Sequence, residues 1–558
     1  MTPFFVGVTG HRVLGANSIA QARGDVQAQI RRLQGLLRAT PIVVLSALAE
    51  GADRLVAQVA LECDCVLWAV LPTSVENYLE DFESEASREE FHRLLAKSAR
   101  TINASLLCGR GEDARERPQI YVDLAHQVCR MSHLVIALWD GACEEKPGGT
   151  SQVVRKFLTG EFPGAGESVI GCPDFGPVIH IKVSREDARV DSTGPIWLTP
   201  RPGGPGRLAL PEQFTAIKDF ESSLTCLAAF NARLGAQGLH PAQAAEQLLP
   251  VAYDWRADGL LSQWLGWFSA AEKVNARAAY ERLRNLCAVV LLFVVFTLAT
   301  LAYGGLVTRA WPLLVGIFAL GTAAAVYAWH RVHDIDELWV GSRAFAEFLR
   351  VGIVLRTAGC EQRVHHVASE EGVFSTDWVG IAVRAIDILA SVQPATGGAA
   401  SEPRSVIDFW CKQQQDYFFD GANKIAHHAR LARKYGLLSA ACIGFALLVY
   451  LLTWLIDVGA SGAKREQVAF VTAWSMYIYW GLLSLAAVVA SISQIIGHAQ
   501  HELDYQFALV KFRIATRHLG VASGLVAPQL AAQLGRAALR EVVLWLKVHR
   551  ARPLRLPF

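Results

Sequence analysis

Four long uncharged apolar segments set the strongest limit on how this 558-residue chain can fold. They cover residues 286–307, 310–329, 435–456 and 468–493. Each approaches the roughly 20 residues that a helix needs to cross the hydrocarbon core of a bilayer. Hydrophobic residues make up 52% of the chain and charged residues only 19%, which is an apolar balance for a soluble protein. We therefore expect four membrane-spanning helices in two hairpins.

Basic residues beside these segments predict their orientation. The paired segments are flanked on their outer ends by Arg277, Arg282, Arg284, Arg331, Arg430, Arg433, Lys434, Lys511 and Arg513. The short loops within the pairs carry only Arg309, Lys464 and Arg465. Because cytoplasmic flanks carry the excess of Lys and Arg, we expect a multi-pass protein of the inner (cytoplasmic) membrane with both termini in the cytoplasm. The N-terminus does not resemble a secretory signal.

The first 195 residues alternate short apolar runs with helical patterns, which predicts a different kind of domain. The expected strands are Phe4–Val8, Ile42–Ala47, Val66–Leu71, Ser105–Cys108, Leu134–Leu138 and Val178–Val183. A first helix is expected after Asn17 or Ser18, either of which could cap it. Continuous apolar strands between helices indicate an α/β fold, a Rossmann-like doubly wound parallel sheet covered on both faces.

Composition divides the whole chain into four regions. We expect residues 1–195 to form the α/β domain, 196–270 a linker with connector helices, and 271–525 an all-α transmembrane bundle with cytoplasmic helical extensions. Residues 526–558 would form an amphipathic C-terminal tail that contacts the membrane surface or another subunit.

Polar residues follow the expected strands where each strand ends. In doubly wound sheets the ligand crevice lies outside these carboxyl ends, so the residues should gather at one edge. Adjacent glycines at the start of a helix, as in Gly148–Thr150, form a site for a phosphate or carboxylate. The candidate ligand-binding residues are Gly10, His11, Arg12, Glu50, Gly51, Asp53, Tyr78, Trp139, Asp140, Gly148, Gly149 and Thr150.

Several of these residues have side chains suited to binding a nucleotide. Arg12 could pair with a phosphate, Glu50 or Asp53 could accept ribose hydroxyls, and Trp139 or Tyr78 could stack on a base. Taken singly, the glycines could simply make turns and Asp53 could simply cap a helix. Their shared position is therefore the stronger argument.

Four motifs in this order resemble the SLOG superfamily, the Rossmann-like fold named for the DprA/Smf and LOG proteins. They are GVTGHR (7–12), SALAEGADRLVA (46–57), LPTSVENYLEDF (71–82), and LVIALWDG (134–141) followed by KPGGTSQ (146–152). The resemblance implies a domain that binds a nucleotide or a nucleotide derivative. In the hydrolytic members the glycine loop is PGGxGTxxE, whereas this loop is shorter and has Gln152 where a carboxylate is expected. An amide cannot act as a carboxylate base, which favours binding over hydrolysis.

Two segments beside the apolar hairpins resemble the SLATT class of membrane modules. They are WVGSRAFAEFLR (339–350) and FWCKQQQDYFFDGANKIAHHARLARKYG (409–436). The class accompanies nucleotide-sensing domains and is proposed to form pores. The resemblance implies an effector in defence against phage, in which a nucleotide-derived signal drives pore formation or membrane disruption.

The expected partners are therefore a nucleotide-derived small molecule, the lipid bilayer and further copies of the chain in a homo-oligomer. The net charge of +2 does not favour nucleic acid, and neither a metal nor a resident cofactor is expected. Two alternatives stay open. One is a membrane-anchored nucleotide hydrolase of the LOG or NAD-cleaving type, with Glu50 and Asp53 as its carboxylates. The other is a nucleotide-gated channel without toxicity.

Overall fold

The computed structural model describes residues 1–108, 117–142, 146–160, 175–186, 194–199, 217–251, 253–305, 310–360, 363–370, 376–393, 403–459, 468, 470–479, 481–482, 498–521 and 527–551. The chain divides into two compact units. Unit 1 combines Met1–Ala271 with Ala344–Pro403, and unit 2 combines Glu272–Arg343 with Arg404–Phe558.

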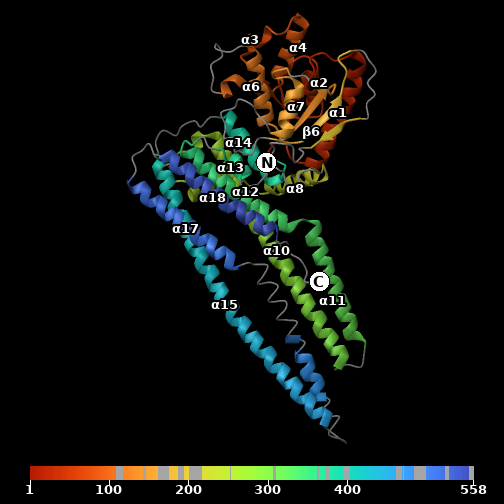
Figure 1. Cartoon of the computed structure of the whole chain (residues 1–558), viewed down its shortest axis with the longest axis vertical. Helices are drawn as coiled ribbons and strands as arrows, with labels where there is room; N and C mark the ends of the chain where they lie inside the picture. The colour runs from red at the N-terminus through yellow and green to blue at the C-terminus, as the bar shows by residue number, and fades with distance from the viewer. Residues whose placement is uncertain are drawn as a thin grey trace. The chain divides into compact units, whose positions relative to one another are not determined.

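Unit 1 contains a sheet of seven strands among the described residues (Figure 1). The strands are β1 (Phe4–Gly10), β2 (Ile42–Ser46), β3 (Val66–Leu71), β4 (Arg100–Asn103), β5 (Leu134–Trp139), β6 (Val178–Lys182) and β7 (Ile196–Leu198). Their spatial order is β4-β3-β2-β1-β5-β6-β7, and every pairing is parallel except that of β6 with β7. The strand order therefore reverses direction between β1 and β5. The parallel α/β sheet predicted from the apolar runs is confirmed.

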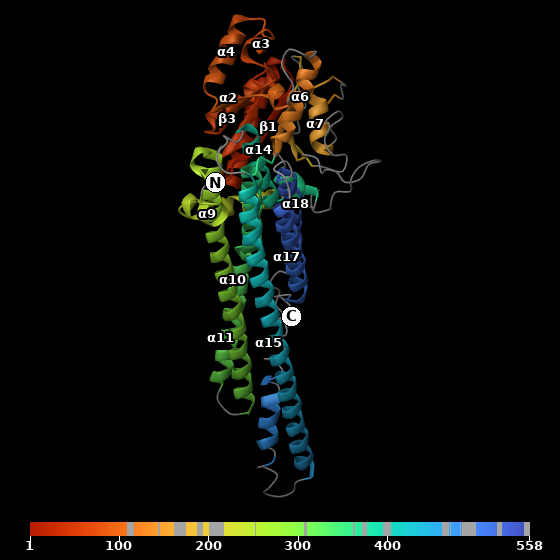
Figure 2. The same ribbon diagram turned by 90° about the vertical axis from the view of Figure 1, so that its left-hand side faces the viewer.

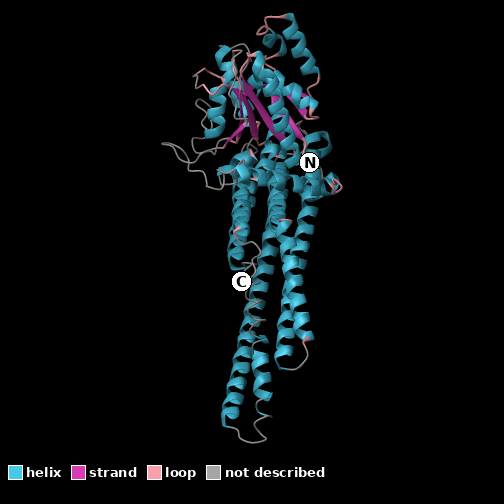
Figure 3. Ribbon diagram, turned by 90° about the vertical axis from the view of Figure 1, so that its right-hand side faces the viewer, coloured by secondary structure: helices cyan, strands magenta, loops and turns pink. Residues whose placement is uncertain are grey.

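Helices cover both faces of this sheet (Figures 2 and 3). They are α1 (Ala16–Leu37), α2 (Ala52–Glu62), α3 (Val75–Leu79), α4 (Glu85–Ala96), α5 (Ala104–Leu107), α6 (Arg117–Arg130) and α7 (Thr150–Thr159). Two glycines of β1 point to opposite faces, because side chains alternate along a strand. A Cβ at Gly10 would lie 2.3 Å from Cβ of Ala52 in α2, and one at Gly7 would lie 3.1 Å from Val128 in α6. The two helices thus approach β1 closely from opposite sides.

Two local predictions are wrong. The expected strand Ser105–Cys108 is the helix α5 and the turn after it, because Asn103 ends β4 and caps α5 by accepting from the N–H groups of Ser105 and Leu106. The first helix begins at Ala16 after Gly15, without a side-chain cap. The hydroxyl of Ser18 instead accepts from the N–H of Ser184.

Unit 1 also contains helices that come much later in the chain. They are α8 (Ile217–Gly235), α9 (Pro241–Leu248), α13 (Val364–Glu370), α14 (Trp378–Val392) and parts of α10 (Gly259–Gly305) and α12 (Ile335–Thr357). Phe230 of α8 packs against Phe345 of α12 and Trp378 of α14, with ring centroids 5.1 and 5.2 Å apart. The α14 helix also contacts β1. These contacts group residues 344–403 with the α/β domain. The division of the sequence into continuous regions had placed these residues with the membrane helices.

Arg384 of α14 is buried and joins three parts of unit 1. Its guanidinium donates to the carbonyl oxygens of Cys129, Arg130 and Phe175, at 2.8, 3.3 and 3.2 Å. Replacing it by methionine should lower the free energy of unfolding by about 3 kcal/mol, because buried carbonyls left without donors cost about 1–3 kcal/mol each. Thermal unfolding of the full chain in detergent measures this loss. An Arg384→Lys variant, which keeps the charge but lacks the fork of donors, should lose less. Equal stability of all three proteins would contradict this role.

Unit 2 consists of helices in its described residues. They are α11 (Trp311–Val332), α15 (Pro403–Gly459), α17 (His498–Val521), α18 (Ala527–Arg550) and the remaining parts of α10 and α12. Three stretches among the described residues are long and apolar enough to cross a membrane: Gly259–Thr300, Trp311–Thr357 and Gly436–Ile456. They contain most of the first three expected spans and indicate a membrane protein. Most of the fourth, 468–493, falls outside the described residues. Four crossings and the positions of the termini stay predictions.

A largely buried polar cluster joins the two helices of the first apolar hairpin at the ends away from their connecting loop. The carboxylate of Asp336 lies 2.7 Å from Nε of Arg282 and 3.1 Å from Nε2 of His330. The amide nitrogen of Asn285 lies 3.3 Å from Nδ1 of the same histidine. The cluster therefore joins α10, α11 and the start of α12 within unit 2.

The amphipathic tail forms α18, and residues of unit 2 cover much of its apolar face. Trp545 and His549 pack against the ring of Trp339, with centroids 5.5 and 5.3 Å apart. Nε of Arg550 lies 3.1 Å from the carboxylate of Glu337. This helix therefore stabilises the start of α12 from within its own unit. The expected contact with a membrane surface or another subunit stays a prediction.

Candidate ligand-binding site

A cavity of about 550 Å³ opens in unit 1 at the carboxyl ends of β1 and β5. These strands flank the point where the strand order reverses, which is the usual ligand position in doubly wound sheets. The volume lies within the range of small-molecule sites. Apolar side chains of Val8, Leu124, Val128 and Val153 form part of its wall.

The turn between β2 and α2 fixes the loop that follows β1. The N–H of Ala52 donates to the carbonyl of His11 at 3.0 Å, and the N–H of His11 donates to that of Leu138 at 3.1 Å. Gly51 has a φ of 76°, and a Cβ there would lie 2.3 Å from the carbonyl oxygen of Arg12. Only glycine combines this backbone conformation with such a close approach. The sequence therefore needs glycine here to place His11 and Arg12.

Replacing Gly51 by alanine should lower the free energy of unfolding by about 2–3 kcal/mol, because both the positive φ and the backbone clash penalise a Cβ. Thermal unfolding of the full chain measures this change. Gly24→Ala in α1 is the matched control, since a Cβ there meets nothing within 4 Å. It should be neutral or stabilise by up to about 1 kcal/mol. Equal unfolding temperatures for the two variants would contradict the assigned role of Gly51.

The start of α7 offers hydrogen-bond donors to the cavity. The helix begins at Thr150 after Gly149, which makes no side-chain cap. Its first intrahelical bond is donated by Val153, and within the described part of the chain nothing accepts from the N–H groups of Thr150, Ser151 and Gln152. Such N–H groups, with the positive end of the helix dipole, favour an anion.

Gln152 has a structural task in this loop. Its side-chain oxygen accepts from the N–H of Gly148 at 2.7 Å. Gly148 has a φ of 70° and lies against the backbone of Tyr121, where a Cβ would be only 2.6 Å from the carbonyl carbon. The amide thus fixes the glycine loop, at the position where the PGGxGTxxE pattern has its glutamate.

Three cationic side chains line the cavity: Arg12, Lys146 and Arg185. Nη2 of Arg12 donates to the hydroxyl of Tyr121 at 3.0 Å and lies 3.7 Å from the carboxylate of Asp81. Lys146 precedes the glycine loop and is exposed. The cavity wall beside the start of α7 therefore carries Lys146 and two guanidinium groups, of which Arg12 is paired with Asp81 and Arg185 with Asp140.

His11, Asp140 and Arg185 form a second charged group. The carboxylate of Asp140 lies 3.1 Å from Nε2 of His11 and 3.3 Å from Nε of Arg185. Burial acts to raise the pKa of Asp140, but the N–H of Ala142 and the charges of His11 and Arg185 together lower it. Asp140 is therefore an anion that positions two residues of the cavity wall.

Two polar groups lie at the buried floor. Asp53, in the first turn of α2, and Tyr78 of α3 are 9% and 1% exposed, and both line the cavity. Within the described ranges, neither Oδ1 of Asp53 nor the hydroxyl of Tyr78 has a hydrogen-bond partner. Burial raises the pKa of Asp53 to about 7, against the opposing effects of Arg12, the Ala49 N–H and Arg54.

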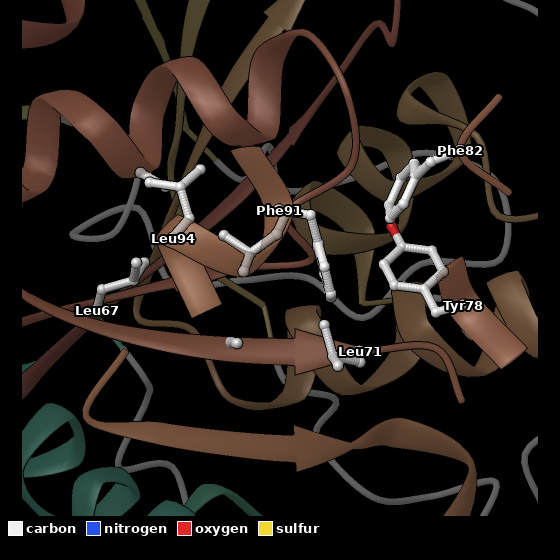
Figure 4. Close-up of a cluster of buried hydrophobic side chains, with 9 residues drawn as sticks. Leu67, Leu71, Tyr78, Phe82, Phe91 and Leu94 are labelled. Carbon is white, nitrogen blue, oxygen red and sulfur yellow. The ribbon is translucent and has the colours of Figure 1, made fainter. Parts of the chain in front are cut away.

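The ring of Tyr78 is part of the hydrophobic core (Figure 4). It meets Phe82 and Phe91 edge-on, with ring centroids 5.0 and 5.8 Å apart. Its faces are therefore not exposed for stacking on a base, which differs from the sequence expectation. The polar group that Tyr78 offers to a ligand is its hydroxyl. Trp139 also lines the cavity, and its Nε1 donates to the carbonyl of Ala142 at 3.0 Å.

Most of the candidate residues gather at this cavity. Those that line it are Gly10, His11, Arg12, Asp53, Tyr78, Trp139, Gly148, Gly149 and Thr150. Glu50, Gly51 and Asp140 are not among its lining residues. Glu50 instead accepts from the hydroxyl of Ser87. That these residues bind a ligand stays a prediction.

No protein-family model, curated protein or solved structure matches this chain. The similarity to SLOG and SLATT proteins therefore rests on the quoted motifs alone, and the chemistry of the site must support the function by itself.

Four charged or aromatic residues of the cavity wall were not predicted from the sequence: Asp81, Tyr121, Lys146 and Arg185. Asp81 and Lys146 lie within quoted motifs, so a wider reading of those motifs would have included them. Arg185 follows β6, and the rule that polar residues gather at carboxyl ends would have found it. Tyr121 lies in the middle of α6, where the sequence pattern gives no such signal.

Proposed function

We propose that unit 1 binds a phosphorylated, nucleotide-derived small molecule and thereby controls a membrane effector. The observation that carries this proposal is the anion site: three N–H groups at the start of α7, with Lys146, Arg12 and Arg185 lining the same cavity. Helix N-termini and guanidinium groups are the usual protein partners of phosphate.

The rest of the cavity supports a ligand larger than inorganic phosphate. Its volume of about 550 Å³ exceeds what a phosphate needs, and apolar residues line part of it. Trp139 lies at the end of β5, where an aromatic ring could contact a base. Asp53 and Tyr78 supply polar groups at a distance from the mouth of the site. A nucleotide combines these features.

The effector part of the proposal rests on the membrane helices and on the family resemblance. Three helices that are long and apolar enough to cross a membrane support an output in the bilayer. The ligand must bind the active arrangement more tightly, and a tenfold preference corresponds to about 1.4 kcal/mol. The resemblance to SLOG and SLATT proteins favours pore formation in a homo-oligomer during antiphage defence.

Titration of the detergent-solubilised full chain with nucleoside mono- and diphosphates tests the proposal. Lys146→Ala should weaken binding about tenfold, because it removes one charged partner of the phosphate. Lys97→Ala, at the end of α4, is the matched control and should bind as the wild type does. The same ligands should release dye from liposomes that contain the protein. Failure of every phosphorylated compound to bind would contradict the proposal.

A membrane-anchored nucleotide hydrolase is the second candidate. A buried carboxyl group whose pKa is raised to about 7 is suited to general acid or base catalysis at neutral pH, and Asp53 is such a group in the cavity. Mass spectrometry of ligands incubated with the protein separates the two functions. A sensor returns its ligand intact, whereas a hydrolase releases a free base, and Asp53→Asn should stop that release.

A further inference from the structure

Two buried polar atoms, in residues that line the cavity, indicate which chemical groups a ligand would present there. Oδ1 of Asp53 and the hydroxyl of Tyr78 have no hydrogen-bond partner within the part of the chain that the structure describes. Leaving such groups unpaired costs stability, so nearly all buried polar groups in proteins are paired. Two unpaired groups on the wall of one cavity indicate that a ligand supplies the missing partners.

The fold holds both groups in place. Asp53 lies in the first turn of α2, which follows β2 after residues 47–51, and Tyr78 lies in α3 after the neighbouring strand β3. The core rings Phe82 and Phe91 pack edge-on against the phenol ring and hold it in place (Figure 4). Asp53 and Tyr78 line the same cavity. Burial raises the pKa of Tyr78, and the charge of Asp53 acts in the same direction.

The chemistry of this pair favours ligand hydroxyls over a second phosphate. A carboxylate accepts hydrogen bonds and repels anions, whereas a phenol can both donate and accept. Adjacent hydroxyls can donate to Asp53 and accept from Tyr78 at the same time. A nucleobase amine could donate to the carboxylate as well, but the base is separated from the phosphate by the sugar.

The position of Arg12 favours the ribose over the base as the part of the ligand that Asp53 and Tyr78 recognise. Arg12 lines the cavity with the start of α7, and its Nη2 lies 3.7 Å from the carboxylate of Asp81, whose N–H donates to the carbonyl of Tyr78 at 3.1 Å. The floor is therefore near the group that binds phosphate. In a nucleotide the ribose adjoins the phosphate.

We propose that Asp53 and Tyr78 form a hydroxyl-recognition subsite, which makes the protein select phosphorylated ribose compounds over their deoxy forms. This assignment rests on the function proposed above. A site built to hydrogen-bond a hydroxyl rejects the analogue that lacks it, because its own buried groups are then left unpaired. Loss of both hydroxyls should therefore weaken binding by about 100-fold or more.

The same geometry couples binding to a proton. In the cavity without ligand, burial raises the pKa of Asp53 to about 7; Arg12, the N–H of Ala49 and Arg54 act against that rise. Glu50, three residues before Asp53, carries a further carboxylate, which accepts from the hydroxyl of Ser87. Hydroxyls that donate to Asp53 favour its ionised form, so binding releases a proton and affinity should increase from pH 6 to pH 8.

The experiment compares AMP, GMP, CMP and UMP, each beside its 2′,3′-dideoxy form, for binding to the full chain in detergent. The wild type should prefer at least one ribonucleotide over its dideoxy partner by about 100-fold. Tyr78→Phe keeps the core ring and removes only the hydroxyl, and Asp53→Asn keeps the size of the side chain. Each should reduce that preference at least tenfold and leave the affinity for the dideoxy compound within about threefold.

The outcomes separate this inference from the proposed function. Equal affinity for a ribonucleotide and its dideoxy partner overturns the hydroxyl subsite and leaves phosphate binding intact. A preference that survives in both variants also overturns the assignment to Asp53 and Tyr78. Strong dependence on the identity of the base, with no dependence on the sugar, assigns the floor to a base amine. Binding of none of the eight compounds, and of none of the nucleoside diphosphates, contradicts both proposals.

Discussion

Replacing Gly149 by aspartate is expected to abolish binding of phosphorylated ligands, with a loss of at least about 100-fold in affinity. Gly149 occupies the N-cap of α7, with φ −75° and ψ 163°, a conformation that aspartate adopts easily. A carboxylate there would accept from the free N–H groups of the first turn and repel an incoming phosphate. Losing two charge-assisted hydrogen bonds corresponds to about 3 kcal/mol or more. Isothermal titration calorimetry measures this change.

The same variant should remain folded, because an N-cap aspartate stabilises a helix by a few tenths of a kcal/mol relative to glycine. Gly149→Ala is the control for the added Cβ, which would lie 3.0 Å from the carbonyl oxygen of Lys146. It leaves the N–H groups free and should bind within about threefold of the wild type. If the aspartate variant binds as tightly as the alanine variant, the anion does not lie at the start of α7.

The second large effect is a pH-dependent gain in stability for Asp53→Asn. Burial raises the pKa of Asp53 from 3.8 to about 7 in the folded chain. The folded state therefore favours the protonated form, and the wild type loses stability as the pH rises from about 4 to about 7. Between pH 5 and pH 8 this loss amounts to about 3 kcal/mol, which asparagine avoids because it carries no charge.

Thermal unfolding of the wild type and of Asp53→Asn, both without ligand, at pH 5 and pH 8 measures this effect. The difference between the two proteins should grow by several degrees from pH 5 to pH 8, in favour of the variant. Other carboxyl groups titrate in both proteins and cancel in the comparison. A difference that stays constant with pH would show that Asp53 is ionised and solvated in the folded state.

If Asp53→Asn is more stable than the wild type and discriminates less between ribonucleotides and their dideoxy forms, Asp53 serves ligand binding and not folding. A buried carboxyl group with one oxygen left without a hydrogen-bond partner does not help the chain to fold. Glu50 lacks this property, because its carboxylate already accepts from Ser87. Of the two carboxylates named for the hydrolase alternative, only Asp53 lines the cavity.

The sequence predicted the sheet well because the strands are short continuous apolar runs ended by polar or glycine residues. Five of the six expected strands lie within two residues of β1, β2, β3, β5 and β6. The sixth, Ser105–Cys108, was wrong because the cap formed by Asn103 decided between strand and helix. A run of four residues carries too little periodicity to make that distinction.

The candidate site was predicted largely by one rule, that polar groups gather at the carboxyl ends of parallel strands. The rule does not say which way a side chain turns. Glu50 turns to Ser87, and Tyr78 places its ring in the core, because contacts between distant segments decide these orientations. The grouping of residues 344–403 with the α/β domain could not be predicted for the same reason. Arg384 donates to carbonyl groups that lie more than 200 residues away along the chain.

The central claim is that unit 1 binds a phosphorylated ribose compound at the start of α7. Mass spectrometry of small molecules released by denaturing the purified full-length chain, loaded beforehand with a mixture of nucleoside monophosphates, tests it most directly. The account predicts a ribonucleotide released from the wild type and from Gly149→Ala, and none from Gly149→Asp. Release of the same compound from the wild type and from Gly149→Asp, or release of no phosphorylated compound from any of the three, would contradict it.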